Sequence, residues 1–89
     1  MNGLLLSLIF TSVAINVEAM AQSRLLESVK RNPDEAKSIC QSFSELNKNN
    51  ISFGSPESIQ KISTEKNISE VDAEILSMYV RGLYCPETF

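Results

Sequence analysis

Two cysteines, Cys40 and Cys85, are the residues of this sequence whose type is best suited to covalent chemistry. Their wide separation matches neither a CxxC redox motif nor the spacing of zinc ligands. Two cysteines in a small exported domain usually form a structural disulfide, and we therefore predict a Cys40–Cys85 bridge. Two alternatives stay open from the sequence, a pair of free thiols and a redox-active pair. A redox role requires an exposed, readily ionised thiol, which does not suit Cys40 on the apolar face of a helix.

Catalytic chemistry has few candidate residues here, because the sequence contains no histidine. Imidazole acid–base catalysis, histidine-ligated zinc and a Ser/His/Asp triad are therefore excluded for this chain alone. Three carboxylates, Glu70, Asp72 and Glu74, are close in sequence. At every second position of a helix they diverge around it, so they indicate solvated charges rather than an acid–base pair or a calcium site. We expect no catalytic residue, no metal and no cofactor, and thus no enzyme.

Composition narrows the class of protein further. Eight Lys and Arg residues against eleven Asp and Glu give a net charge of −3, so the cationic excess of a nucleic-acid-binding protein is missing. A hydrophobic share of 43% with 21% charged residues is typical of a folded domain. At 89 residues, the chain has room for a single domain.

Residues 1–21 predict a secretory signal peptide. Residues 4–15 (LLLSLIFTSVAI) form an uncharged apolar run with the length of a signal-peptide core, which is shorter than the roughly 20 residues of a membrane-spanning helix. Ala19, Met20 and Ala21 match a cleavage motif, which predicts a mature helical domain over residues 22–89, exported to the periplasm or secreted. Two alternatives are an uncleaved membrane anchor formed by residues 4–17, which would be the chain's one contact with a membrane, and a buried N-terminal core helix.

After residue 22 the apolar residues follow helical periodicity, and no strand pattern competes with it. The expected helices cover residues 24–31, 33–46, 56–66 and 70–84. Asn32 with Glu35 has the spacing of a capping box, and Ser69 can cap the last helix at Asp72. The stretch 47–54 (NKNNISFG) predicts a loop. The fold class is therefore all-α, a small bundle of three to four short helices with one disulfide.

The periodicity also predicts a core and a contact surface. The last helix is expected to bury one broad face, which consists of Val71, Ile75, Leu76, Met78, Tyr79 and Leu83, and to expose Glu74, Ser77 and Arg81. The core of the whole domain is expected to contain Leu25, Val29, Ile39, Phe43, Ile59, Ile62, Ile75, Leu76, Tyr79 and Leu83. Tyr84 lies off the main apolar stripe, so it indicates an exposed contact surface, with Phe89 and Met78 as its neighbours.

Several of these residues also carry a resemblance. Cys40 on a helix, a polar turn, a short helix, Ala73 and the closing Tyr84-Cys85-Pro86 resemble a family of small exported bacterial domains of unknown function. The final segment is similar to small uncharacterised proteins of marine cyanobacteria. The resemblance covers about residues 36–86 and implies a helical fold with a Cys40–Cys85 bridge, but no activity. The chain departs from that family in its polar stretch 47–50.

These observations favour a non-enzymatic role in interaction or structure, with a protein as the expected kind of partner. One alternative is a carrier that holds a small apolar ligand between its helices. Another is a single-pass subunit of a membrane complex in which the signal segment is retained.

Overall fold

The computed structural model describes residues 24–89, which are helical in four segments and contain no strand. A first helical stretch covers residues 24–31, and it is followed by α2 (Pro33–Lys48), α3 (Pro56–Lys66) and α4 (Glu70–Tyr84). The all-α prediction is confirmed. The predicted signal peptide, its alternative as an anchor over residues 4–17 and the expected mature start at Gln22 lie outside the described residues. From residue 24 onward, no helix has the length and apolar character needed to cross a bilayer.

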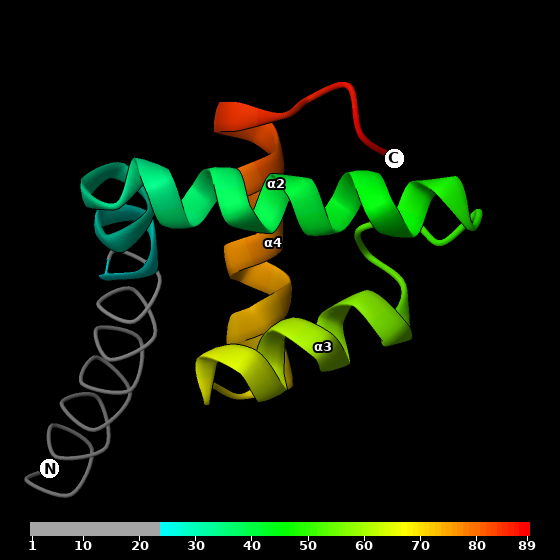
Figure 1. The fold of residues 1–89 in the computed structure, drawn as a ribbon. Helices are drawn as coiled ribbons and strands as arrows, with labels where there is room; N and C mark the ends of the chain where they lie inside the picture. Colours follow the sequence, from blue (N-terminus) through cyan, green and yellow to red (C-terminus); the bar gives the residue numbers. More distant parts are fainter. Residues whose placement is uncertain (1–23) are drawn as a thin grey trace, which may run out of the picture.

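The helices are arranged around α4. α2 and α3 both contact α4, and they lie on the same side of it, with α2 crossing α4 near its C-terminal half (Figure 1). The core fills the space between them, and Phe43 at its centre is fully buried. Its ring meets the edge of Phe53 at a centroid distance of 5.9 Å, so the loop after α2 is held against the core.

Local sequence explains where α3 and α4 begin and end. The Ser55 side chain accepts a hydrogen bond from the Ser58 N–H (3.3 Å), and the Ser69 side chain accepts one from the Asp72 N–H (3.1 Å). Each bond satisfies an amide that the first helical turn leaves unpaired. Asn67 ends α3 in the left-handed conformation with φ 54°. The predicted cap at Ser69 and the predicted helix over 70–84 are confirmed.

The start of α2 differs from the prediction. Asn32 occupies the N-cap position, but its side chain caps nothing and instead donates from Nδ2 to the Ser28 carbonyl (3.1 Å). Glu35 forms an ion pair with Lys66 of α3 (3.0 Å), which takes its carboxylate away from the helix start. The predicted capping box is therefore wrong, because each of its two side chains has another partner.

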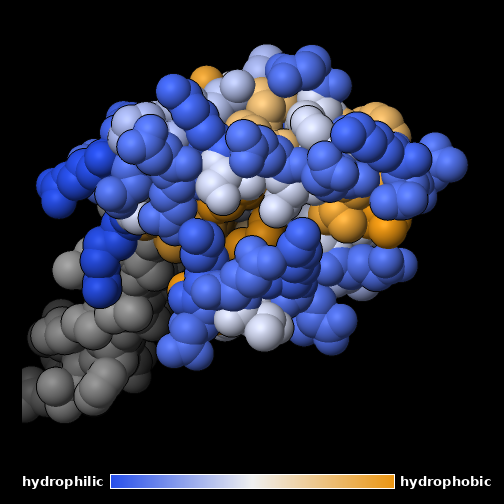
Figure 2. All heavy atoms as spheres, viewed as in Figure 1, coloured by the Kyte–Doolittle hydropathy of each residue, from blue (hydrophilic) through white to orange (hydrophobic). Residues whose placement is uncertain are grey.

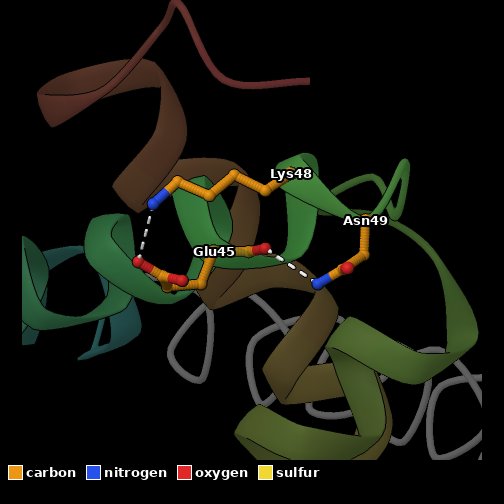
Figure 3. A network of polar contacts seen from close by, with 3 residues as sticks. All are labelled: Glu45, Lys48 and Asn49. Atoms are coloured by element: carbon orange, nitrogen blue, oxygen red, sulfur yellow. Dashed lines mark hydrogen bonds and ion pairs between the residues drawn. The ribbon is translucent and has the colours of Figure 1, made fainter.

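The C-terminal end of α2 is closed by its asparagines. Asn50 adopts a left-handed conformation with φ 60°, and the Ile51 N–H donates to the Leu46 carbonyl (2.9 Å), as in a Schellman motif. Figure 3 shows the polar contacts here, where Asn49 Nδ2 donates to the Glu45 carbonyl (3.3 Å) and Lys48 pairs with the Glu45 carboxylate (3.2 Å). The ion pair is largely exposed and contributes little stability. The helix thus extends two residues further than predicted.

The predicted core is confirmed in its centre. Five of its residues are buried, namely Val29, Ile39, Phe43, Ile62 and Leu76. Four others are half-buried, namely Leu25, Ile59, Ile75 and Tyr79. Leu83 is 52% exposed, and its assignment to the core is wrong.

The buried face of α4 is rotated from the predicted one. Ala73, Ser77 and Val80 are buried there, whereas Val71 and Met78 are exposed. α2 and α3 pack on the side of α4 that carries the small residues Ala73 and Ser77, where short side chains let helices come close. The placement of Ser77 on the polar side was therefore wrong, as was that of Val71 and Met78 on the buried side.

Candidate functional site

The two cysteines form the predicted disulfide. Cys40 lies in the middle of α2 and Cys85 follows the last residue of α4, with their Sγ atoms 2.09 Å apart and their Cα atoms 6.0 Å apart. Cys85 is buried, and Cys40 is half-buried against the core. The described residues therefore hold no free thiol. The bridge fixes the C-terminal end of α4 against the middle of α2.

The residues after the bridge fold back on the domain. Arg81 Nε donates to the Thr88 carbonyl (2.7 Å), and the Arg81 guanidinium lies 4.6 Å from the ring centre of Phe53. The Phe89 backbone pairs with the Asn47 side chain in both directions, since its N–H donates to Oδ1 (3.0 Å) and its carbonyl accepts from Nδ2 (2.7 Å). The tail is thus anchored to α2 and to the loop that follows it.

The three residues predicted to share a contact surface do not share one environment. Met78 and Phe89 are 59% and 53% exposed. Tyr84 is half-buried against the core, and its hydroxyl donates to the Val29 carbonyl (3.3 Å). Tyr84 is therefore not the exposed aromatic residue that the sequence suggested, because its ring packs against the core and its hydroxyl bonds to the first helical stretch.

A pocket of about 230 Å³ lies between the first helical stretch, α2 and α4. Its floor is made of side chains that are both apolar and buried, which are Val29, Ala36, Ile39, Leu76 and Val80. Leu25 and Ile68 complete the apolar walls. Hydrophobic atoms are visible in the gap between the polar surfaces of α2 and α3 (Figure 2).

The rim of this pocket is polar. Ser28, Asn32, Glu35 and Lys66 line it, and the first three are exposed. The Lys66 ammonium and the Glu35 carboxylate are 3.0 Å apart, with side chains 29% and 42% exposed. Because the two charges neutralise each other, the rim favours neither an anion nor a cation.

The floor of the pocket is chemically inert. The floor holds no polar side chain, and within residues 24–89 no group of three or more potential ligands could hold a metal ion. An apolar cavity of about 150 Å³ is known to stay dry and to take up benzene, so one of this size and lining suits a slightly larger apolar molecule.

Sequence reasoning missed the pocket as a site. Its apolar members were expected in the core, and the Glu35–Lys66 pair joins two helices that are distant in sequence. Lys66 was noted as the end of a helix and Glu35 as part of a cap. No local pattern signals such a pair, since only the packing of α3 beside α2 brings it together.

Comparison with known proteins identifies the chain at the level of a family. No curated protein and no solved structure matches it. The family model described as Domain of unknown function (DUF8664) matches residues 26–85. That range starts within the first helical stretch and ends at Cys85, so it contains both bridged cysteines and the whole pocket apart from Leu25. An uncharacterised family was expected, whereas bacterial origin and the marine cyanobacterial relatives stay predictions. Because the match covers most of the chain, the protein belongs to the DUF8664 family.

Proposed function

We propose that this chain is an exported, non-enzymatic binding protein that holds a small apolar ligand in the pocket between residues 24–31, α2 and α4. The pocket itself supports the proposal, because five buried apolar side chains from three elements form its floor. The pocket opens to solvent at its polar rim, and its space of about 230 Å³ gives a small ligand direct contact with this apolar floor.

The lining defines the class of ligand. The floor favours an uncharged hydrocarbon group, because a buried charge or an unpaired polar group would lose its hydration without compensation. A hydroxyl at one end of the ligand would meet the rim, where Ser28 and Asn32 supply hydrogen-bonding groups. A short-chain alcohol is the simplest molecule with these properties.

Export and the lack of catalysis are also parts of the proposal. The Cys40–Cys85 disulfide is compatible with an oxidising compartment, where such bridges persist. The lack of histidine in the sequence and the unreactive pocket floor support a binding role rather than catalysis. The intact mass of protein recovered from its native compartment, before and after alkylation, tests export: a chain starting at Gln22 without alkylatable thiols is expected. A retained Met1 or two alkylated thiols would contradict it.

Ligand binding is tested with 1-octanol, added to the oxidised protein and followed by isothermal titration or by NMR shifts. A ligand of this size is expected to bind with a Kd between about 10 µM and 1 mM. The shifted resonances should belong to the floor residues. An absence of saturable binding, or NMR shifts confined to residues of the outer surface, would contradict the proposed function.

Two matched variants distinguish octanol binding in the pocket from non-specific hydrophobic binding elsewhere on the surface. Ala36→Leu adds three carbons to the floor of the pocket, which Ala36 lines, and it should weaken octanol binding at least tenfold. Ser38→Leu adds an apolar side chain at an exposed position of the same helix, and it should leave the Kd unchanged within about twofold. Equal effects of the two variants would show that the alcohol binds elsewhere.

A further inference from the structure

α4 carries a second apolar face on the side away from the core. Val71, Ile75, Met78 and Gly82, here called the outer stripe, follow one another at i, i+4, i+7 and i+11, so they lie on one line of the helix. Val71 is 66% exposed and Met78 is 59% exposed. At 3.6 residues per turn the stripe lies opposite the buried residues of α4. Ile75 is half-buried, and α3 approaches the stripe at Val71, which lines a surface hollow together with Ile59. A helix that is apolar on nearly all sides is usually buried on all sides.

The stripe ends at a glycine with open space around it. A Cβ atom at Gly82 would meet nothing within 4 Å, and its φ is not positive. Neither packing within the chain nor backbone conformation therefore requires glycine here, although glycine costs up to about 1 kcal/mol against alanine inside a helix. A flat position on an apolar stripe lets the backbone of another helix approach closely.

The stripe is also complementary to itself. Around a midpoint between Leu76 and Ser77, Val71 is placed symmetrically to Gly82, and Ile75 symmetrically to Met78. In an antiparallel pair of α4 helices related by a two-fold axis, the bulky Val71 of one copy would face the Gly82 of the other. A two-fold interface uses the same patch on both subunits and requires this kind of self-complementarity.

Charge selects the same orientation. The first turn of α4 carries the acidic Glu70 and Asp72, and its last turn carries the basic Arg81. A parallel pair would place two acidic ends together, whereas an antiparallel pair places each acidic end near the end of α4 that carries Arg81 and also opposes the helix dipoles. The Arg81 guanidinium keeps its charge although it also contacts Phe53 and the Thr88 carbonyl.

From these observations we propose that two copies of the chain associate through the outer stripe, with their α4 helices antiparallel. The interaction surface goes beyond ligand binding, since the stripe and the pocket lie on different sides of α4 and use different residues. α4 is about 22 Å long at 1.5 Å per residue, so the interface is small and the association weak.

Analytical ultracentrifugation of the oxidised protein tests the proposal. The wild-type chain should change from monomer to dimer between about 10 µM and 1 mM. Met78→Glu should weaken the dimer at least tenfold, because it places a charge in the stripe. Leu83→Glu is the matched control, since Leu83 is similarly exposed (52%) on the same helix but off the stripe, and it should change the Kd less than about twofold.

The variant Gly82→Leu distinguishes close helix packing at Gly82 from non-specific hydrophobic association. A Cβ atom at position 82 meets nothing within 4 Å in the monomer and the position is exposed, so the variant should fold with unchanged or higher stability, yet its dimer should be at least tenfold weaker. NMR of a dimer with one isotope-labelled copy should show contacts between the Met78 methyl and the Ile75 methyl of the other copy. A wild-type chain that is monomeric at 1 mM, a leucine variant that dimerises more tightly, or contacts between the Val71 methyls of the two copies, which a parallel pair would give, would each overturn the proposal.

Discussion

Two buried serines, Ser58 in α3 and Ser77 in α4, differ in whether the side-chain hydroxyl has a hydrogen-bond partner. Ser77 Oγ donates to the Ala73 carbonyl (2.7 Å). Ser58 is 0% exposed, and its Oγ has no hydrogen-bond partner among the described residues. A buried hydroxyl without a partner loses its hydration and gains nothing in return.

Replacing each serine by alanine should therefore have opposite effects on stability. Ser58→Ala should raise the free energy of unfolding by up to about 1 kcal/mol, and Ser77→Ala should lower it by about 0.5–1 kcal/mol. Urea unfolding of both oxidised variants measures the difference. A loss of stability in Ser58→Ala as large as that in Ser77→Ala would mean that the Ser58 hydroxyl does have a partner.

The Glu35–Lys66 pair should set the charge preference of the pocket. In Glu35→Gln the Lys66 ammonium, 3.0 Å away in the wild-type chain, loses its counter-charge, so octanoate should bind roughly three- to fivefold more tightly than before. Octanol carries no charge and should bind as it did. Glu45→Gln breaks the exposed pair with Lys48 outside the pocket, and it should leave both affinities unchanged. An equal gain for octanoate in both variants would trace the effect to net charge alone.

At the scale of the helix, the caps differ in strength although their residue types look alike. Ser69 accepts from the Asp72 amide (3.1 Å), whereas the Asn32 side chain makes no cap bond. Ser69→Ala should thus destabilise the protein by about 1 kcal/mol. Asn32→Ala removes only an exposed bond to the Ser28 carbonyl and should cost less than half as much. Thermal unfolding of the two variants measures this difference in stability. A larger loss of stability in Asn32→Ala than in Ser69→Ala would contradict this assignment of caps.

Local signals in the sequence are sufficient for most of the fold. Ser55 and Ser69 bond to amides three residues ahead, so caps of this kind can be predicted from sequence. The boundaries of α3 and α4 were correct for that reason. The capping box at Asn32 failed, because Glu35 is attracted by a lysine on another helix.

The buried face of α4 could not be predicted from its periodicity. Apolar residues occur on nearly every side of this helix, from Val71 through Leu76 to Leu83. The choice among faces depends on where α2 and α3 pack, and Cys85 at the exit of α4 fixes that side through its bridge to α2. The candidate pocket could not be predicted from the sequence for a related reason, since its floor combines three elements that meet only in the folded chain.

At the scale of the whole molecule, the disulfide should carry a large share of the stability. It joins residues separated by 45 positions, and a closed loop of this size stabilises a fold by about 4 kcal/mol through the entropy of the unfolded chain. A small core supplies about 3–5 kcal/mol in total. We therefore expect that reduction unfolds the domain near room temperature.

Circular dichroism with and without reductant measures this effect. The double variant Cys40→Ser/Cys85→Ser should lose helicity to the same extent and should not respond to reductant. If the reduced wild-type chain kept its full helicity and its urea midpoint, the packing of the helices would be sufficient without the bridge.

The same bridge has a consequence for a chain exposed to proteases. α3, α4 and both of the turns that flank α3 lie inside the ring that it closes. A peptide bond cut in either turn would open the ring but release no fragment, since the two pieces would still share a sulfur–sulfur bond. Damaged molecules would therefore keep their full mass on a non-reducing gel and would separate into two bands only after thiol treatment.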